Sequence, residues 1–130
     1  MEQQSPYAPT TDQLVVEVFA RDIEASKRFY IDLGFELLED RGDFVTLAWE
    51  GHKFFLDARP DQPPPTASPQ ANMRIMVPDV DRLWAHATEL GAAVLAPIED
   101  RSYGLRDFTI LDPDGFGLRF GSWLGKDAGH

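Results

Sequence analysis

The sequence predicts an α+β fold of two tandem modules, each built from a strand, a helix and three further strands. Three observations predict it: a strand followed by a helix occurs twice at a constant spacing, β-rich segments follow each helix, and a proline-rich stretch separates the halves. An alternating strand and an amphipathic helix each bury one face, so each helix is expected to cover one face of its own mixed sheet. The 130 residues suffice for one compact domain, residues 1–130, that contains both modules.

The first module, residues 13–58, begins with a strand that has two different faces. The alternation has the period of a β-strand. One face consists of Val16, Val18 and Ala20, and the other of Val15, Glu17 and Phe19. Asp22 can then cap a helix by accepting a backbone N–H, and Gly34 can end that helix in the left-handed conformation. Three short β-rich runs follow, separated by turns at Gly42 and Gly51.

The second module, residues 71–123, repeats this order. Asp79 and Gly91 lie 57 positions after the capping aspartate and the final glycine of the first helix, which indicates a duplicated unit. The helix between them has an apolar stripe at helical spacing, made of Val80, Leu83, Trp84, Ala87 and Leu90. We interpret Trp84 as core. The last two of three β-rich runs are joined by the turn Asp-Pro-Asp-Gly at 112–115, whose aspartates are expected to form Asx-turn hydrogen bonds.

Residues 59–70 connect the two modules. This stretch, RPDQPPPTASPQ, is rich in proline and cannot hold a regular strand ladder, so it is expected to be extended. A plain connector is the favoured interpretation, and a mobile flap over a binding site is the alternative.

Charge and composition exclude several functions. Twelve basic residues against twenty-two acidic ones give a net charge of −10, which disfavours nucleic acid and anionic membranes and would attract a cationic ligand. The chain has no cysteine, so disulfides, thiolate metal sites and a cysteine nucleophile are excluded. No apolar run approaches the roughly 20 residues of a membrane span, and the first residues lack a signal-peptide pattern. A cytoplasmic location without membrane contact is therefore expected.

Three segments resemble the vicinal oxygen chelate superfamily, which includes glyoxalase I, extradiol dioxygenases, fosfomycin-resistance enzymes and bleomycin-resistance proteins. They are ARDIEASKRFYIDLGFE, VPDVDRLWAHATELGA and YGLRDFTILDPDGFGLRF. With their spacing they cover residues 13–123, and the last motif is closest to the bleomycin-resistance branch. The resemblance implies the glyoxalase/bleomycin-resistance fold, in which the sheets of two βαβββ modules curl around a shared concave cavity.

The resemblance also places the metal ligands of the metal-dependent members. Those positions are Val15, Asn72 and Arg119, and the fourth ligand would come from the strand that contains His52 and Asp57. Valine has no donor atom, neutral asparagine is a weak ligand, and a protonated arginine repels a cation. We therefore predict neither a metal nor another cofactor.

The same positions instead suggest a ligand-binding cavity. Glycines at 117 and 121 leave room around Arg119, and Tyr103 matches an aromatic against which a planar ligand can stack in bleomycin-resistance proteins. We predict ligand contacts from Glu17, Phe19, Trp49, Phe55, Asn72, Arg74, Tyr103 and Arg119. Two alternatives remain: Glu17 and Arg119 form an ion pair between the first and last strands, and the aromatic side chains are core. Adjacent strand residues face opposite ways, so the choice between Phe54 and Phe55 rests on the register of that strand.

Three functions are compatible with these residues. The favoured one is a metal-free protein, with no catalytic residues, that sequesters a small aromatic antibiotic or metabolite; the acidic chain suits a cationic one. The second is an enzyme: a glyoxalase-type lyase or isomerase, or a dioxygenase-like enzyme, with displaced metal ligands, or a metal-free enzyme with Glu17 as base. The third is a protein-interaction module with a vestigial cavity.

The expected partners are a small-molecule ligand and a second copy of the chain. A homodimer is implied by the resemblance, because the relatives often complete their cavities between two chains. Residues 5–13 would then be an arm exchanged between subunits, or alternatively only a terminus without fixed structure.

Overall fold

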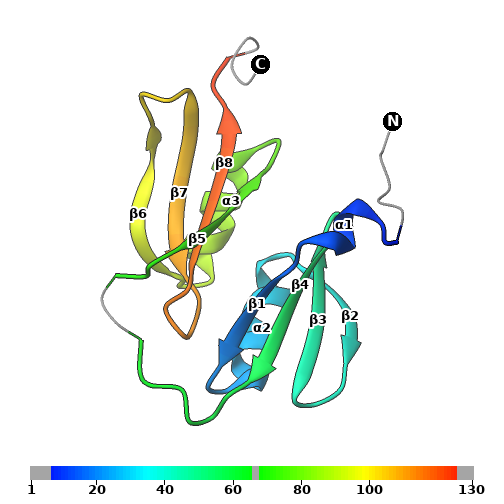
Figure 1. Cartoon of the computed structure of the whole chain (residues 1–130). Helices are drawn as coiled ribbons and strands as arrows, with labels where there is room; N and C mark the ends of the chain where they lie inside the picture. The colour runs from blue at the N-terminus through cyan, green and yellow to red at the C-terminus, as the bar shows by residue number, and fades with distance from the viewer. Residues whose placement is uncertain (1–6, 66–67, 126–130) are drawn as a thin grey trace. The chain divides into compact units, whose positions relative to one another are not determined.

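The structure is a computed structural model that describes residues 7–65 and 68–125. They form two compact units, divided between Pro63 and Pro64 (Figure 1). The first unit contains, in order, α1 (Thr10–Gln13), β1 (Val16–Ala20), α2 (Ile23–Leu33), β2 (Glu36–Asp40), β3 (Phe44–Trp49) and β4 (His52–Ala58). The second unit contains β5 (Asn72–Met76), α3 (Val80–Glu89), β6 (Ala93–Asp100), β7 (Leu105–Leu111) and β8 (Gly117–Trp123).

Each unit has one mixed four-stranded sheet in which the first strand pairs with the last. In the first unit the order is β1-β4-β3-β2, and in the second it is β5-β8-β7-β6. The pairs β1–β4 and β5–β8 are parallel, and the other pairs are antiparallel. A parallel pair needs a long crossover, which in each unit includes the helix and the two intervening strands. The predicted α+β fold of two βαβββ modules is confirmed.

In the first unit, α2 covers one face of the sheet and begins and ends as predicted. Asp22 Oδ1 accepts a hydrogen bond of 3.1 Å from the backbone N–H of Ala25, and Gly34 ends the helix with φ 134°. The buried ring of Tyr30 lies 4.8 Å, centroid to centroid, from that of Phe54, which joins the helix to the sheet. The opposite face of this sheet is not covered by α2, and the short α1 contacts β4 (Figure 1).

In the second unit, α3 covers one face of its sheet in the same way. Asp79 Oδ1 accepts from the backbone N–H of Arg82 at 3.1 Å. The Trp84 ring lies 5.0 Å from the buried ring of Phe108, so the interpretation of Trp84 as core is confirmed. In the turn between β7 and β8, buried Asp112 accepts from the backbone N–H groups of Asp114 at 2.9 Å and Phe116 at 2.8 Å. These are the Asx-turn bonds expected for this hairpin.

The segments outside the modules have different structures. The linker is described at 59–65 and 68–70, where it has no helix or strand, as its prolines predict. The sequence analysis did not predict α1, which is held to β4 by a 3.0 Å ion pair between Asp12 and Lys53. The predicted arm, 5–13, is described only from Tyr7. None of the described helices is long and apolar enough to cross a membrane.

Candidate ligand-binding surfaces

Three predicted site residues share the face of the first sheet that α2 does not cover, called here the first open face. The register sets Glu17 opposite Phe55 and Phe19 opposite Asp57 across the parallel β1–β4 pair. Directly paired residues of neighbouring strands point to the same side of a sheet. Phe54 is only 1% exposed beneath α2, and Phe55 consequently lies on the open face, which is compatible with the predicted ligand contact from Phe55.

Trp49 does not join these residues. It lies an odd number of positions from Thr46, which pairs with Phe55, and is therefore on the face covered by α2. Its ring centroid lies 5.1 Å from that of buried Phe35, and a Cβ added to Gly34 would come within 3.2 Å of its ring. The predicted contact from Trp49 needed it on the open face, but side chains of a strand alternate between the two faces. The register between β3 and β4 decides which aromatic residue of β3 faces away from the helix.

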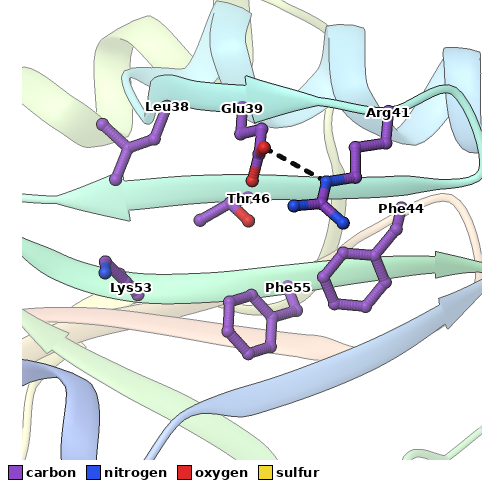
Figure 2. Close-up of a pocket in the computed structure, with 7 residues that line it drawn as sticks. All are labelled: Leu38, Glu39, Arg41, Phe44, Thr46, Lys53 and Phe55. Carbon is purple, nitrogen blue, oxygen red and sulfur yellow. Dashed lines mark hydrogen bonds and ion pairs between the residues drawn. The ribbon is translucent and has the colours of Figure 1, made fainter.

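A groove of about 550 Å³ lies on the first open face, over β2, β3 and β4 (Figure 2). Its lining is Leu38, Glu39, Arg41, Phe44, Thr46, Lys53 and Phe55. Two aromatic rings lie side by side in it, with the centroids of Phe44 and Phe55 5.2 Å apart and the planes tilted by 49°. Arg41 Nε contacts Glu39 at 3.1 Å along the rim. Of the predicted site residues, only Phe55 lines this groove.

A second cluster on the first open face joins Glu17 to Asp57, Arg59 and Phe19. Asp57 Oδ2 lies 2.9 Å from an Arg59 terminal nitrogen, and the Arg59 guanidinium carbon lies 4.1 Å from the centroid of the Phe19 ring. The pKa of Glu17 is raised, first because its carboxyl shares a hydrogen bond with Asp57, and further by desolvation and by repulsion from the Asp57 charge. Arg59 lowers the pKa of Glu17, but its effect is smaller.

Glu17 is therefore expected to keep its proton at a higher pH than an ordinary glutamate with a pKa of 4.5. The folded state binds this proton more tightly than the unfolded chain. The pair thus stabilises the fold below the ordinary pKa, and this contribution is lost as the pH rises through the raised pKa of Glu17. Carboxyl ¹³C NMR titration measures the shift, and Asp57→Asn is the matched variant. A Glu17 pKa that Asp57→Asn leaves unchanged would contradict the assigned cause.

The second unit has a helix-free face of its own, called the second open face, and Asp107 is its central charge. Asp107 is 2% exposed, yet three side chains of its own unit surround its carboxylate. Arg101 Nε donates to Oδ1 at 2.7 Å, the Tyr103 hydroxyl donates to Oδ2 at 2.7 Å, and Arg119 Nε lies 3.3 Å from Oδ2. The hydrogen bond to Asp107, followed by desolvation, raises the pKa of Tyr103, so its phenol stays protonated and donates.

The structure brings four predicted residues together on the second open face. Arg74 of β5 lies directly opposite Arg119 of β8, and Asn72 lies opposite Gly117 in the same pair. The Arg119 guanidinium carbon lies 5.4 Å from the centroid of the Tyr103 ring. Within its own unit, Arg119 lies beside Asp107, and Glu17 shares a hydrogen bond with Asp57. The alternative ion pair between Glu17 and Arg119 would join the two units and stays a prediction.

Gly121 makes room for the buried carboxylate. It pairs with Asp107 across β7–β8, and a Cβ at this glycine would lie 3.1 Å from the Asp107 Cβ. The sequence analysis singled out the glycine and Arg119 but missed Asp107. The alternation of side chains along their two strands could have indicated the face of Asp107 as it did that of Arg119. Only the register between the strands shows that the two side chains lie close together.

These residues do not fit a divalent metal. No three His, Cys, Asp or Glu side chains of residues 7–65 and 68–125 gather into a group able to hold one. More directly, the position that the resemblance assigns to a ligand on the last strand is Arg119, whose Nε faces a carboxylate at 3.3 Å. A guanidinium offers only donors, so it cannot ligate a cation.

Comparison with known proteins agrees with this fold. The family described as the Glyoxalase/Bleomycin resistance protein/Dioxygenase superfamily matches residues 12–120. No curated protein matches the chain. A glyoxalase/bleomycin resistance protein/dioxygenase from Alicyclobacillus acidocaldarius is 20% identical, with a TM-score of 0.74 over 88% of this chain and 92% of that one.

Two further solved structures are named for bleomycin. A bleomycin resistance determinant encoded on the transposon Tn5 is 20% identical, with a TM-score of 0.69 over 85% of this chain and 97% of that one. A bleomycin-binding protein complexed with bleomycin is 20% identical, with a TM-score of 0.69 over 85% and 98%. At 20% identity, the likeness to these solved structures shows the fold alone. The family is shown by the superfamily match to residues 12–120. The chain belongs to the glyoxalase/bleomycin resistance protein/dioxygenase superfamily.

Proposed function

We propose that the protein binds a small planar aromatic molecule and holds it without chemical change. The observation that carries this proposal is the groove of about 550 Å³ on the first open face, with the paired rings of Phe44 and Phe55 exposed to it. Offset or tilted rings favour a third ring beside them, and they bind it with little loss of side-chain entropy. The bleomycin-binding protein among the similar structures supports this class of function.

The polar rim of the groove adds orientation. Arg41 and Lys53 line it, and each lies near a carboxylate, Glu39 at 3.1 Å and Asp12 at 3.0 Å. Polar groups at the edge of an apolar surface fix the orientation of a bound molecule. The chain is strongly acidic as a whole, but this rim holds charges of both signs, so the groove itself does not select a cation.

A thermal-shift screen with bleomycin and with other aromatic compounds of each charge tests the proposal. A ligand at 100 times its Kd should raise the free energy of unfolding by roughly 2.7 kcal/mol. Mass spectrometry of the recovered ligand then shows whether it was altered. Failure of every aromatic compound to stabilise the protein would reject the proposal and favour the interaction module.

Phe55→Ala is expected to weaken binding of an aromatic ligand by about tenfold, because it removes one of the two rings that the ligand would contact. Isothermal titration calorimetry measures the change. Phe29→Ala is the matched control, since Phe29 is a partly exposed phenylalanine on α2, outside the groove. Equal affinity of the Phe55 variant and the native protein would remove the groove from the binding site.

Glu17 supports a second candidate, a metal-free enzyme that uses a carboxyl group as acid or base. The specific observation is its raised pKa, which a neighbouring carboxylate causes despite the nearby Arg59. Asp57 raises the pKa of Glu17 by more than Arg59 lowers it. An altered ligand in the mass-spectrometric assay, lost in Glu17→Gln, would establish this candidate in place of the first.

The predicted homodimer and the cytoplasmic location also belong to the proposal. Light scattering of the purified protein measures its mass in solution, and a single-chain mass would remove the dimer from it.

A further inference from the structure

Two arginines lie side by side on the second open face. Arg74 and Arg119 are direct partners across the parallel β5–β8 pair, where like charges repel each other. Arg74 is exposed, and no hydrogen bond or ion pair joins it to another described residue. A protein that carries a net charge of −10 thus has a local excess of positive charge on this face.

The nearby carboxylate does not neutralise this pair. Both oxygens of Asp107 are already engaged, Oδ1 by Arg101 at 2.7 Å and Oδ2 by the Tyr103 hydroxyl at 2.7 Å. Arg119 approaches Oδ2 at 3.3 Å through Nε, and this buried atom makes no aligned hydrogen bond within the described part of the chain. Arg101 also pairs with Glu99 at 3.3 Å, so three arginines face two carboxylates, which still leaves guanidinium donors of Arg74 and Arg119 for another acceptor.

The surroundings of Arg119 leave the guanidinium accessible and place an aromatic ring beside it. The Arg119 side chain is 28% exposed, and the residues two positions before and after it on the same face are Gly117 and Gly121. Tyr103 is 55% exposed and its ring centroid lies 5.4 Å from the guanidinium carbon. Its hydroxyl donates a hydrogen bond to Asp107, which holds the edge of the ring in place and leaves a ring face for contact with a ligand.

We propose that the second open face binds the anionic group, a carboxylate or phosphate, of an aromatic ligand. Arg74 and Arg119 hold the anion, since guanidinium groups bind both oxyanions through parallel N–H donors. The ring of the ligand contacts Tyr103. The aromatic part of this inference rests on the proposed function, and the inference adds a surface of the second unit and the charge of the ligand that this surface takes. It reverses the expectation of a cation that the net charge of the chain suggested.

The probes are benzoate, phenyl phosphate, and benzamide, which has the size of benzoate without its charge. We expect benzoate or phenyl phosphate to bind about tenfold more tightly than benzamide, as a charge-assisted bidentate contact provides. In ¹H–¹⁵N spectra of arginine side chains, the anion should shift the Nε–H signal of Arg119. The two anions distinguish a carboxylate site from a phosphate site.

Arg74→Met, Arg119→Met and the double variant identify the residues. Arg74→Met breaks no hydrogen bond or ion pair within residues 7–65 and 68–125. Each single change should lower benzoate or phenyl phosphate affinity by about tenfold while benzamide binding stays unchanged. Arg82→Met is the matched control, because Arg82 lies exposed on α3, on the covered side of the same sheet.

The outcomes separate this inference from the proposed function. Benzamide binding as tightly as both anions would overturn the anion site and leave aromatic binding intact. Failure of both anions to bind, or equal loss of affinity in Arg82→Met, would also overturn it. Suppose that anion binding depends on Arg74 and Arg119, and that Phe55→Ala changes the affinity for no aromatic ligand. This result would support the anion site and reject the groove.

Discussion

Asp107→Ala is expected to lower the free energy of unfolding by about 3 kcal/mol, because it removes the carboxylate of a buried, charge-paired network. Arg101 and Tyr103 would each lose a 2.7 Å hydrogen bond, and Arg119 would lose its nearest negative charge. Both guanidinium groups stay protonated; Arg101 would keep Glu99 at 3.3 Å, whereas Arg119, 28% exposed, would be left beside Arg74 without the Asp107 charge. Urea denaturation followed by circular dichroism measures the loss.

Asp107→Asn is the control for this prediction. It keeps the size of the side chain and one acceptor for Arg101, so a smaller loss is expected. It also removes negative charge beside Arg119, and benzoate should then bind more tightly than to the native protein. Native-like stability of Asp107→Ala would show that the network contributes little to the fold.

Phe108→Ala is expected to lower the free energy of unfolding by about 4 kcal/mol, because it leaves a cavity in the core of the second unit. The ring is fully buried, with centroids 5.0 Å from Trp84 and 5.6 Å from Phe120. It therefore joins α3 to the sheet, and its loss should also redshift the fluorescence of Trp84 as water reaches the indole. Thermal unfolding and fluorescence together measure the effect.

Phe108→Leu keeps an apolar side chain at this position and should cost much less, since most of the volume is retained. If Phe108→Ala lowers the free energy of unfolding as little as Phe108→Leu does, the packing of the helix on the sheet does not depend on this ring. The unit closer to the N-terminus has an aromatic core of its own around Tyr30 and should respond less.

The element order could be predicted because its signals are local. Asp22 and Asp79 cap helices through bonds to residues three positions away, and the glycines after the helices provide the backbone conformation that ends them. By contrast, α1 depends on contact between Asp12 and Lys53, which are 41 positions apart. A four-residue helix has little stability of its own, so no local sequence pattern predicts it.

The candidate ligand-binding surfaces were predicted only in part, since they depend on which strands pair and in what register. The alternation placed Glu17, Phe19 and Arg119 on strand faces away from the helices, but it could not show that Trp49 faces α2 while Phe44 lies beside Phe55. The net charge of the chain suggested a cationic ligand. A net charge averages over all faces, however, so it does not give the charge of any one of them. The local pairing of two arginines is a property of the sheet rather than of the composition.

The parallel pairing of β5 with β8 has a consequence for synthesis of the protein on the ribosome. The first unit can close its sheet once β4, which ends at Ala58, has emerged, whereas β5 waits for Gly117–Trp123 before it has a partner. Strand pairings between distant residues form late, and N-terminal domains fold first during synthesis. A nascent chain that stops before β8 would thus present the aromatic groove but lack the arginine pair, whose second member arrives with the closing strand.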